Sequence, residues 1–380
     1  MKTILCSVFT VAVVAAAGHD VAAQEPAPPS RERVADPAWV QELERQIERH
    51  VEAASRALDA ALETALGQNR APQPPRPPRA PRPPREAAGP EFTESFSRTV
   101  RLGRNGTFDL QNVAGDIVVT GSGGDEVRID ATKRVRRPTE REAREILKAL
   151  QIRIVERAGS VEVRTEYPRW RGVSASVDYA VTVPRDGNVT IRGVAGDIRV
   201  SNVRGELRVE SVSGDIALSS VGRVREVKSV SGTIEVTDAE GDEIQGSTVS
   251  GSVIARNLRA RAVALQSVSG TLRFDRVDAA RALLRTISGD IEYGGRLSRS
   301  GRYELRSHSG DLRVVPAGDP GLDVEANTFS GSLRSDYALQ LREFGGPGRA
   351  AGRTLRGTIG DGSAALVLQS FSGDIVIVKE

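Results

Sequence analysis

Carboxylate side chains return in one local context along this chain, in which a glycine precedes the aspartate and an aliphatic residue follows it. Carboxylates at a regular spacing are the ligands of calcium-binding repeat proteins. Two carboxylates that converge on one groove can instead hydrolyse a glycosidic bond. The copies of this pattern, including those with Thr or Ser in place of Asp, begin at Gly115, Gly196, Gly214, Gly232, Gly251, Gly270, Gly289, Gly310, Gly331 and Gly373.

The calcium hypothesis depends on whether every copy carries charge. A calcium-binding roll needs acidic residues and paired glycines in each turn, because oxygens from consecutive loops surround every ion. Here each bend has one glycine, and the aspartate is replaced at Thr233, Ser252, Thr271 and Ser332. Asp, Ser and Thr can all accept a hydrogen bond from a backbone N–H at a bend. We therefore expect this residue to cap a bend, and we expect no metal site.

The hydrolase hypothesis depends on whether two carboxylates meet. Asp215 and Asp290 are four copies apart, which is about 19 Å if each copy is one coil of a stacked sheet, and that is too far to flank one bond. Of the three histidines, only His50 and His308 lie beyond the N-terminal apolar stretch, too few for a histidine metal site or catalytic triad. We expect His308 to be a partly buried structural ring. The sequence predicts no catalytic residues, no cofactor and no enzyme, with a polysaccharide-active β-helix as the less favoured alternative.

The spacing of the glycines predicts the architecture. From Gly196 onward the intervals in residue number are 18, 18, 19, 19, 19, 21, 21 and 42, the last being twice 21. A fixed period of this size is typical of repeat proteins, whose units bury their apolar faces against their neighbours. Gly205 falls halfway between Gly196 and Gly214, so each coil should contain two short strands. We predict an all-β fold, a repetitive parallel β-solenoid of 18–21-residue coils.

Alternation within one copy predicts which side chains face inward. Val194, Gly196 and Ile198 share one parity, so on an extended chain they would all face the interior. The glycine would then mark a corner where a side chain would collide with the interior of the turn. The aspartate that follows it would point outward.

The folded domain is expected to cover residues 91–380. Residues 91–190 form a non-repeating part, with strands around 152–155, 161–165 and 177–183 and one short helix that the capping box at 139–142 begins. Residues 191–380 hold the repeats. The glycines at 345–348 and 360–362 are expected to shape a long surface loop between the last coils.

The N-terminus has the features of a secretory signal over residues 1–23: a positive start at Lys2, an apolar stretch and a small-residue cleavage site between Ala23 and Gln24. Residues 24–37 then form a linker. The one cysteine, Cys6, lies inside the signal, so the mature chain would have no disulfide. We expect an exported protein of the periplasm or the cell surface.

Two further segments precede the domain. Residues 38–67 repeat apolar positions every 3.6 residues, which predicts an amphipathic helix or a coiled coil capable of self-association. Residues 68–90 are rich in proline and form a disordered, extended basic spacer. Its arginines either contact an anionic envelope polymer or lipid surface, or only keep a linker solvated; those considered are Arg76, Arg79, Arg82 and Arg85. A net charge of +3 over 380 residues argues against nucleic acid as a partner.

With these residues in view, the chain resembles the bacterial "putative adhesin" domain family of unknown function, also called Toastrack. The resemblance covers roughly residues 95–380. It rests on the copy at 112–117, the strand at 179–184, the Ser-Val-Ser-Gly-Asp-Ile copies, and the closing segments at 360–362 and 372–375. It implies a β-solenoid-like exported domain without established catalytic residues, in a family associated with envelope adhesion or envelope-linked signalling.

Together these observations predict an exported, non-enzymatic β-solenoid for adhesion or binding at the bacterial cell envelope. The alternative is a periplasmic structural or sensory module whose helix at 38–67 binds a membrane-protein partner.

Overall fold

The structure, a computed structural model, describes residues 90–167, 174–345 and 353–380. The chain divides into two compact units, Met1–Arg82 and Pro83–Glu380, and all of the described residues belong to the second. The predicted signal peptide, amphipathic helix and basic spacer fall outside the described residues and stay predictions. Within the described ranges, no helix is long and apolar enough to cross a bilayer.

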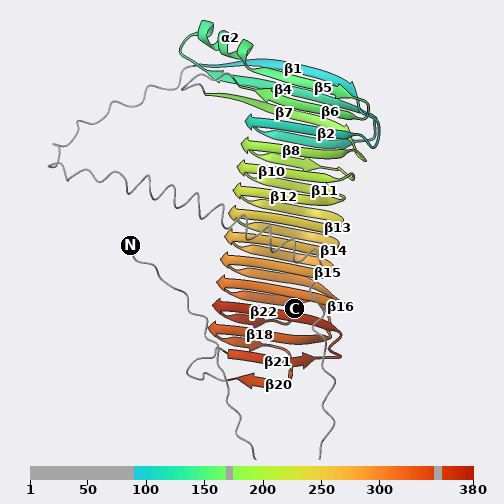
Figure 1. Cartoon of the computed structure of the whole chain (residues 1–380), viewed down its shortest axis with the longest axis vertical. Coiled ribbons are helices and arrows are strands. Elements are labelled where there is room, and N and C mark those ends of the chain that lie inside the picture. Colours follow the sequence, from blue (N-terminus) through green and yellow to red (C-terminus); the bar gives the residue numbers. More distant parts are fainter. Residues whose placement is uncertain (1–89, 168–173, 346–352) are drawn as a thin grey trace, which may run out of the picture. The chain divides into compact units, whose positions relative to one another are not determined.

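The described residues are nearly all β: they form one 23-stranded sheet, wound upon itself, and one α-helix (Figure 1). In chain order the elements are β1 (Glu91–Arg101), β2 (Thr107–Ala114), β3 (Ile117–Ser122), β4 (Glu126–Arg136), α2 (Glu140–Ala149), β5 (Gln151–Arg157), β6 (Ser160–Glu166), β7 (Ala175–Pro184), β8 (Asn188–Ala195), β9 (Ile198–Ser201), β10 (Leu207–Ser213), β11 (Ile216–Val221), β12 (Val224–Ser231), β13 (Ile234–Ser250), β14 (Val253–Ser269), β15 (Leu272–Ser288), β16 (Ile291–Ser309), β17 (Leu312–Pro316), β18 (Leu322–Ser330), β19 (Leu333–Ser335), β20 (Gln340–Gly345), β21 (Arg353–Ile359), β22 (Ala364–Ser372) and β23 (Ile375–Ile377).

Strands in the middle of the sheet pair in parallel with the strands of the neighbouring copies. Val209 in β10 lies opposite Ile191, and Leu305 in β16 lies opposite Leu284, so each partner comes from the preceding copy. β8, β10 and β12 follow one another on one wall, while β9, β11 and the first part of β13 follow one another on the other. The side chains between the walls form a single apolar core, in which Ile216 and Leu218 are no more than 1% exposed.

The first end of the stack closes with antiparallel strands. β1 pairs with β4 and β4 with β7, while β5 pairs antiparallel with β6, so the parallel pattern stops here. The predicted strands around 152–155, 161–165 and 177–183 are observed as β5, β6 and β7. The predicted helix is observed as α2, whose N-cap Thr139 accepts a hydrogen bond from the N–H of Glu142. Its buried face, which includes Ile146 and Leu147, packs in a small cluster with Val135.

The other end departs from chain order. The last strands of the chain, β22 and β23, insert between β16–β17 and β18–β19, because β22 pairs with both β16 and β18 and β23 with both β17 and β19. The copy at Gly373 therefore sits between the copies at Gly310 and Gly331. The doubled interval between Gly331 and Gly373 reflects this return of the chain, which passes through the antiparallel pair β20 and β21. Figure 1 shows β20 at this end.

The parity prediction is wrong for the residue two positions before each glycine. Val194 and Val212 are 45% and 46% exposed, while Ser211, one residue before Val212, is 5% exposed. The reason is local: Gly214 has φ of +118°, and the corner it makes breaks the two-residue alternation between Ser211 and Ile216. The inward row therefore ends on a hydroxyl, and the apolar residue beside it faces out.

The glycine itself is required for a different reason from the one predicted. A Cβ on Gly214 would overlap the carbonyl oxygen of Gly196, the equivalent glycine of the neighbouring copy, rather than the interior of its own turn. The same holds for Gly232 against Gly214. The corners thus stack backbone on backbone, and no side chain fits between them.

Candidate binding surfaces

The aspartates of the repeated pattern join neighbouring copies. The Asp197 carboxylate accepts a hydrogen bond from the N–H of Asp215 (3.1 Å), and the Asp215 carboxylate accepts one from the N–H of Thr233 (2.7 Å). Thr233, Ser252 and Thr271 accept no such bond within the described part of the chain. The predicted bend cap is thus confirmed for Asp, with the difference that the N–H belongs to the adjacent copy. These carboxylates are engaged with backbone, and the described ranges contain no cluster of three or more potential metal ligands.

Apolar side chains form a continuous exposed or half-exposed row at this corner, which we call the apolar stripe. Each member stands two residues before the glycine of its copy, and the strands that carry them pair in register. Exposure is 46% at Val113, 47% at Val230 and 56% at Phe329. In spatial order the members, with one histidine among them, are Val113, Val194, Val212, Val230, Val249, Val268, Ile287, His308, Phe371 and Phe329.

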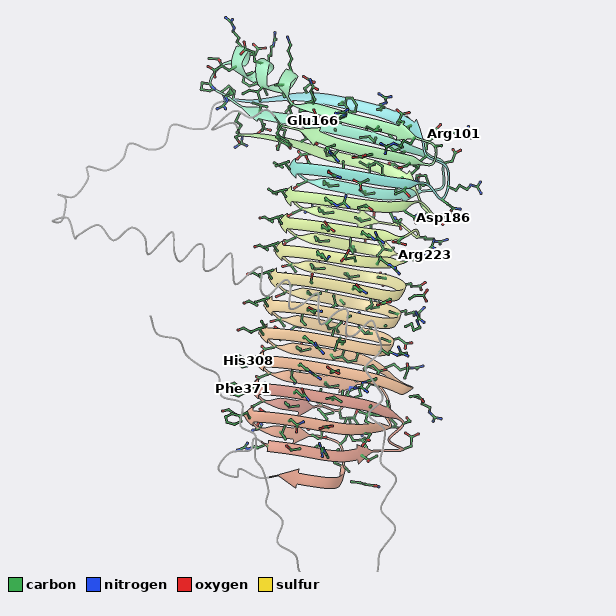
Figure 2. All side chains as sticks on the ribbon, in the orientation of Figure 1. Arg101, Glu166, Asp186, Arg223, His308 and Phe371 are labelled. Carbon is green, nitrogen blue, oxygen red and sulfur yellow. The ribbon has the colours of Figure 1, made fainter. Side chains whose placement is uncertain are left out.

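Three stacked aromatic rings form the last part of the stripe in its spatial order. The rings of His308 and Phe371 lie 5.0 Å apart at 10°, and those of Phe371 and Phe329 lie 4.9 Å apart at 4°. Figure 2 shows His308 and Phe371 at the same edge of the stack, opposite Arg223. His308 is exposed rather than partly buried, so the expectation for its burial is wrong; it serves as one rung of the stripe.

Behind the stripe runs a row of buried polar side chains, one in each copy except the copy at Gly196, where Gly193 takes this place. Ser307 and Ser370 donate to the carbonyls of Gly289 and Gly310, each at 3.1 Å, so they tie one corner to the next. In the middle copies, four buried hydroxyls have no hydrogen-bond partner among the described residues; they belong to Ser229, Thr248, Ser267 and Thr286. Sequence parity could not have found this row, because it placed these residues outside.

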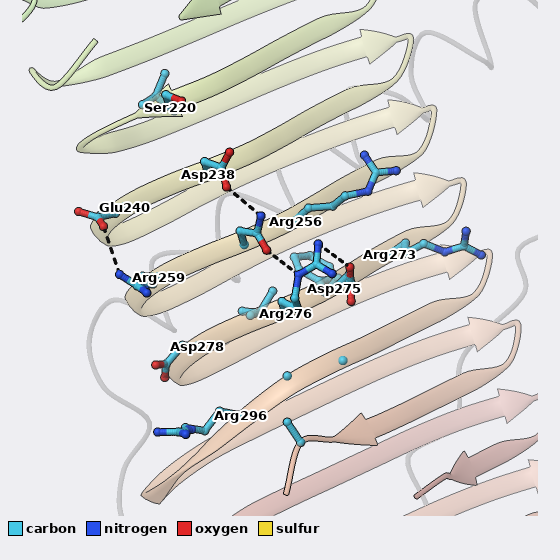
Figure 3. Close-up of a pocket in the computed structure, with 18 of the residues that line it drawn as sticks. Ser220, Asp238, Glu240, Arg256, Arg259, Arg273, Asp275, Arg276, Asp278 and Arg296 are labelled. Atoms are coloured by element: carbon cyan, nitrogen blue, oxygen red, sulfur yellow. Dashed lines mark hydrogen bonds and ion pairs between the residues drawn. The ribbon is translucent and has the colours of Figure 1, made fainter. Parts of the chain in front are cut away.

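The opposite corner is hollowed into an open groove of about 1670 Å³, which we call the charged groove (Figure 3). Its floor follows a column of residues with left-handed backbone, at φ of 51° to 58°, where asparagine or glycine is usual, and all of them except Asn202 line the groove. Seven arginines and seven acidic residues line it. The column consists of Asn202, Ser220, Asp238, Asn257 and Arg276.

Many charges in the charged groove are paired between or within copies. Arg276 donates to the Asn257 amide oxygen (2.6 Å), whose amide group donates to Asp238 (2.8 Å). Glu240 and Arg259 form a looser pair at 3.7 Å, with both side chains more than 70% exposed.

Other charged side chains of the charged groove enter no ion pair or side-chain hydrogen bond within the part of the chain that the structure describes. Figure 3 shows two of them, Asp278 and Arg296, on neighbouring strands. These unpaired charges include Arg204, Asp242, Asp278 and Arg296. The groove therefore offers both hydrogen-bond donors and hydrogen-bond acceptors to a ligand.

The structure separates the carboxylates that the sequence raised as candidates. Asp215 and Asp290 follow the same corner four register steps apart, through Ile216, Ile234, Val253, Leu272 and Ile291. The proposed cleavage site at Ala23 and Gln24 and the spacer arginines Arg76, Arg79, Arg82 and Arg85 lie outside the described residues. The charged groove was missed because its members come from a corner without a fixed motif.

Solved structures that match this chain include a "putative adhesin" from Bacteroides fragilis, 13% identical, with 76% of this chain and 97% of that chain covered at a TM-score of 0.40. A "putative lipid binding protein" from Parabacteroides distasonis is 10% identical, with 75% and 96% covered at 0.38. A "putative cell adhesion protein" from Clostridium sporogenes is 10% identical, with 76% and 100% covered at 0.21. No curated protein matches the chain.

One family model matches most of the domain. The model for Toastrack DUF4097 matches residues 110–378, more than half of the chain, and takes in every copy of the Gly-Asp pattern. The resemblance drawn from the motifs is thereby confirmed. The chain belongs to the Toastrack DUF4097 family.

Proposed function

We propose that this protein is an exported, non-enzymatic domain that binds a polysaccharide of the bacterial cell envelope in the charged groove. One observation carries the proposal: side chains without ion-pair partners among the described residues, Arg204, Arg296, Asp242 and Asp278, line one open groove. A polymer with hydroxyl and amide groups can satisfy both kinds of charge. The equal numbers of arginines and acidic residues argue against a pure polyanion, which would need a surplus of cations.

The regularity of the groove supports a polymeric ligand. In this proposal the domain is a parallel β-solenoid of 18–21-residue coils, so the same groove position returns at about 4.8 Å intervals along the stack. A periodic surface offers a chain-like ligand several equivalent contacts. Each contact is weak on an exposed surface, and their sum gives the affinity.

The N-terminal segments fit the same proposal. Signal cleavage after Ala23 would export the chain to the periplasm or cell surface, and the spacer at 68–90 would hold the domain away from its attachment. The alternative remains a sensory module whose helix at 38–67 binds a membrane protein. A chain lacking residues 38–90 separates the two: it keeps polymer binding in the first case and loses its membrane-protein partner in the second.

A hydrolase is the second candidate, on a specific observation. Glu240 pairs in register with Arg259, and Arg259 with Asp278, so the two carboxylates lie two strands, about 10 Å, apart in one groove. However, the Glu240 side chain is 72% exposed, and a general acid needs the desolvation that raises its pKa. Release of reducing ends from polysaccharide, abolished by Asp278→Asn, would favour the hydrolase.

The binding test uses co-sedimentation of the mature chain with peptidoglycan sacculi, which carry both charges. We expect Asp278→Asn/Arg296→Gln to bind at least about tenfold more weakly, since each lost charge-assisted hydrogen bond costs about 1.5 kcal/mol or more. The matched control is Arg101→Gln/Asp125→Asn, an exposed pair at 3.2 Å outside the groove, which makes the same change of charge. Equal sedimentation of the two variants would refute the groove as the binding site.

A further inference from the structure

The apolar stripe has ten members, and the proposed polymer site in the charged groove does not explain why they are exposed or half-exposed. Nine steps of about 4.8 Å make the stripe roughly 43 Å long. Its side chains, many of them half-exposed, present about 500 Å² of apolar surface, within the range of the largest patches on soluble proteins. We propose that the stripe is the interface of a homodimer, in which two copies pack in parallel about a two-fold axis along the stack.

The shape of this corner is self-complementary. Beside the stripe stand the next two residues of each copy, which are Ala or Ser and then Gly in all ten copies, as in Ser213-Gly214. We call this row of small residues the furrow. The corner thus has one row of large side chains and one row of small ones, side by side. The large side chains of the stripe form a ridge. The ridge of a second copy can pack into the furrow of the first copy, while the ridge of the first copy packs into the furrow of the second.

Only one two-fold arrangement makes that fit. Rotation about an axis along the stack exchanges the two sides of the corner and keeps each copy at its own level, so ridge meets furrow. Rotation about an axis across the stack sets ridge on ridge and furrow on furrow. The parallel arrangement is therefore the one that buries the stripe, and the two surfaces together approach the roughly 1,200 Å² at which stable interfaces begin.

Charge complementarity favours the same arrangement. On the far side of the furrow lies the aspartate row, and on the far side of the stripe lies the outward residue four before each glycine. In the parallel pair these rows face each other, so Arg192 meets the level of Asp197. The Arg192 side chain is 45% exposed and already pairs with Asp109 at 2.9 Å, so Asp197 of the second copy would join an existing cluster of charges. Glu210 opposes Asp215, but Arg192 lies 3.5 Å from Glu210 and offsets it. The crosswise arrangement would set aspartate row on aspartate row.

The dimer would leave both charged grooves outward, because groove and stripe occupy opposite corners of the stack (Figure 2). Two grooves on one particle engage one polymer with an effective concentration that raises avidity well above single-site affinity. The dimer proposal does not depend on which ligand the charged groove binds.

Sedimentation equilibrium of the mature full-length chain tests the interface. We expect a dimer whose Kd rises at least tenfold in Phe329→Ser/Phe371→Ser, two exposed positions whose replacement leaves the core intact. The control is Val118→Ser, a 38% exposed valine on β3 that is not a member of the stripe, which should leave Kd unchanged. A monomeric wild type at about 100 μM, or a dimer that the stripe variant retains undiminished, overturns the inference; the latter would assign association to another part of the chain.

Thiol cross-linking tests the orientation. In a Cys6→Ser background, Ser213→Cys and Ser372→Cys place single thiols in the furrow near its two ends. A short bismaleimide should join each variant to itself, because equal levels meet in the parallel pair. Cross-linking only in a mixture of the two variants, or in neither case, overturns the parallel arrangement.

Discussion

The carboxylate of Asp215 accepts a hydrogen bond from the backbone N–H of Thr233 at 2.7 Å, across one strand step of the stack. This contact gives the acidic residue at the corner a backbone partner in the neighbouring copy. It assigns the repeated aspartate a structural role, in which each corner is fastened to the next.

Asp215→Ala should lower the free energy of unfolding by about 1 kcal/mol, because the N–H of Thr233 loses its partner at an exposed corner. Urea unfolding followed by circular dichroism measures the change. Ser252→Ala is the matched control, since Ser252 accepts no such bond within the described residues. An equal loss in both variants would contradict the fastening role.

Gly214→Ala should destabilise the domain by at least about 3 kcal/mol or prevent its folding, because the new Cβ meets the Gly196 carbonyl and φ of +118° is strained for alanine. Gly123→Ala, where a Cβ meets nothing within 4 Å, should leave the midpoint of thermal unfolding unchanged or slightly raised. Soluble, normally folded Gly214→Ala protein would show that the corners do not stack as described.

Tyr293→Phe should keep or raise stability. The Tyr293 hydroxyl is fully buried and has no hydrogen-bond partner among the described residues, so its removal relieves a desolvation cost of about 1 kcal/mol. Tyr303→Phe is the opposite case, because the Tyr303 hydroxyl donates to the Ala279 carbonyl at 2.5 Å and accepts from the Ser298 N–H at 2.7 Å. It should cost about 1–3 kcal/mol. Chemical unfolding measures the free energy of unfolding of both variants. A loss of stability in Tyr293→Phe would contradict the prediction.

Alkaline pH should weaken the fold through Tyr179. Burial raises the pKa of Tyr179 to about 12 from its ordinary value near 10, so the folded state holds the proton more tightly than the unfolded chain. This contribution is complete below about pH 10 and is lost as pH rises toward 12, amounting to about 3 kcal/mol. Urea midpoints at pH 9 and 11.5 should fall less in Tyr179→Phe than in the wild type. An equal fall of the urea midpoint in both proteins would mean that Tyr179 does not take part in the pH dependence of unfolding.

The regular return of the glycine was sufficient to predict an all-β repeat, because each unit of such a stack needs the same corner at the same interval. The pairing of Val209 with Ile191 follows that interval. The capping box at Thr139 was sufficient to predict α2, since its signal is confined to the first helical turn. Both inferences used only local or strictly periodic information.

The tertiary structure decided what local periodicity could not. Parity assigned Val212 to the interior, but the positive φ of Gly214 shifts the alternation, so Ser211 is buried and Val212 becomes part of the apolar stripe. The place of the last copy also depends on a long-range choice, because β22 pairs with β16 and β18 rather than following in chain order. The charged groove likewise exists only once separate copies stack. The sequence alone determined the corner and its spacing; the direction in which each corner residue points, and which copies become neighbours, were decided by backbone geometry and strand pairing across the whole domain.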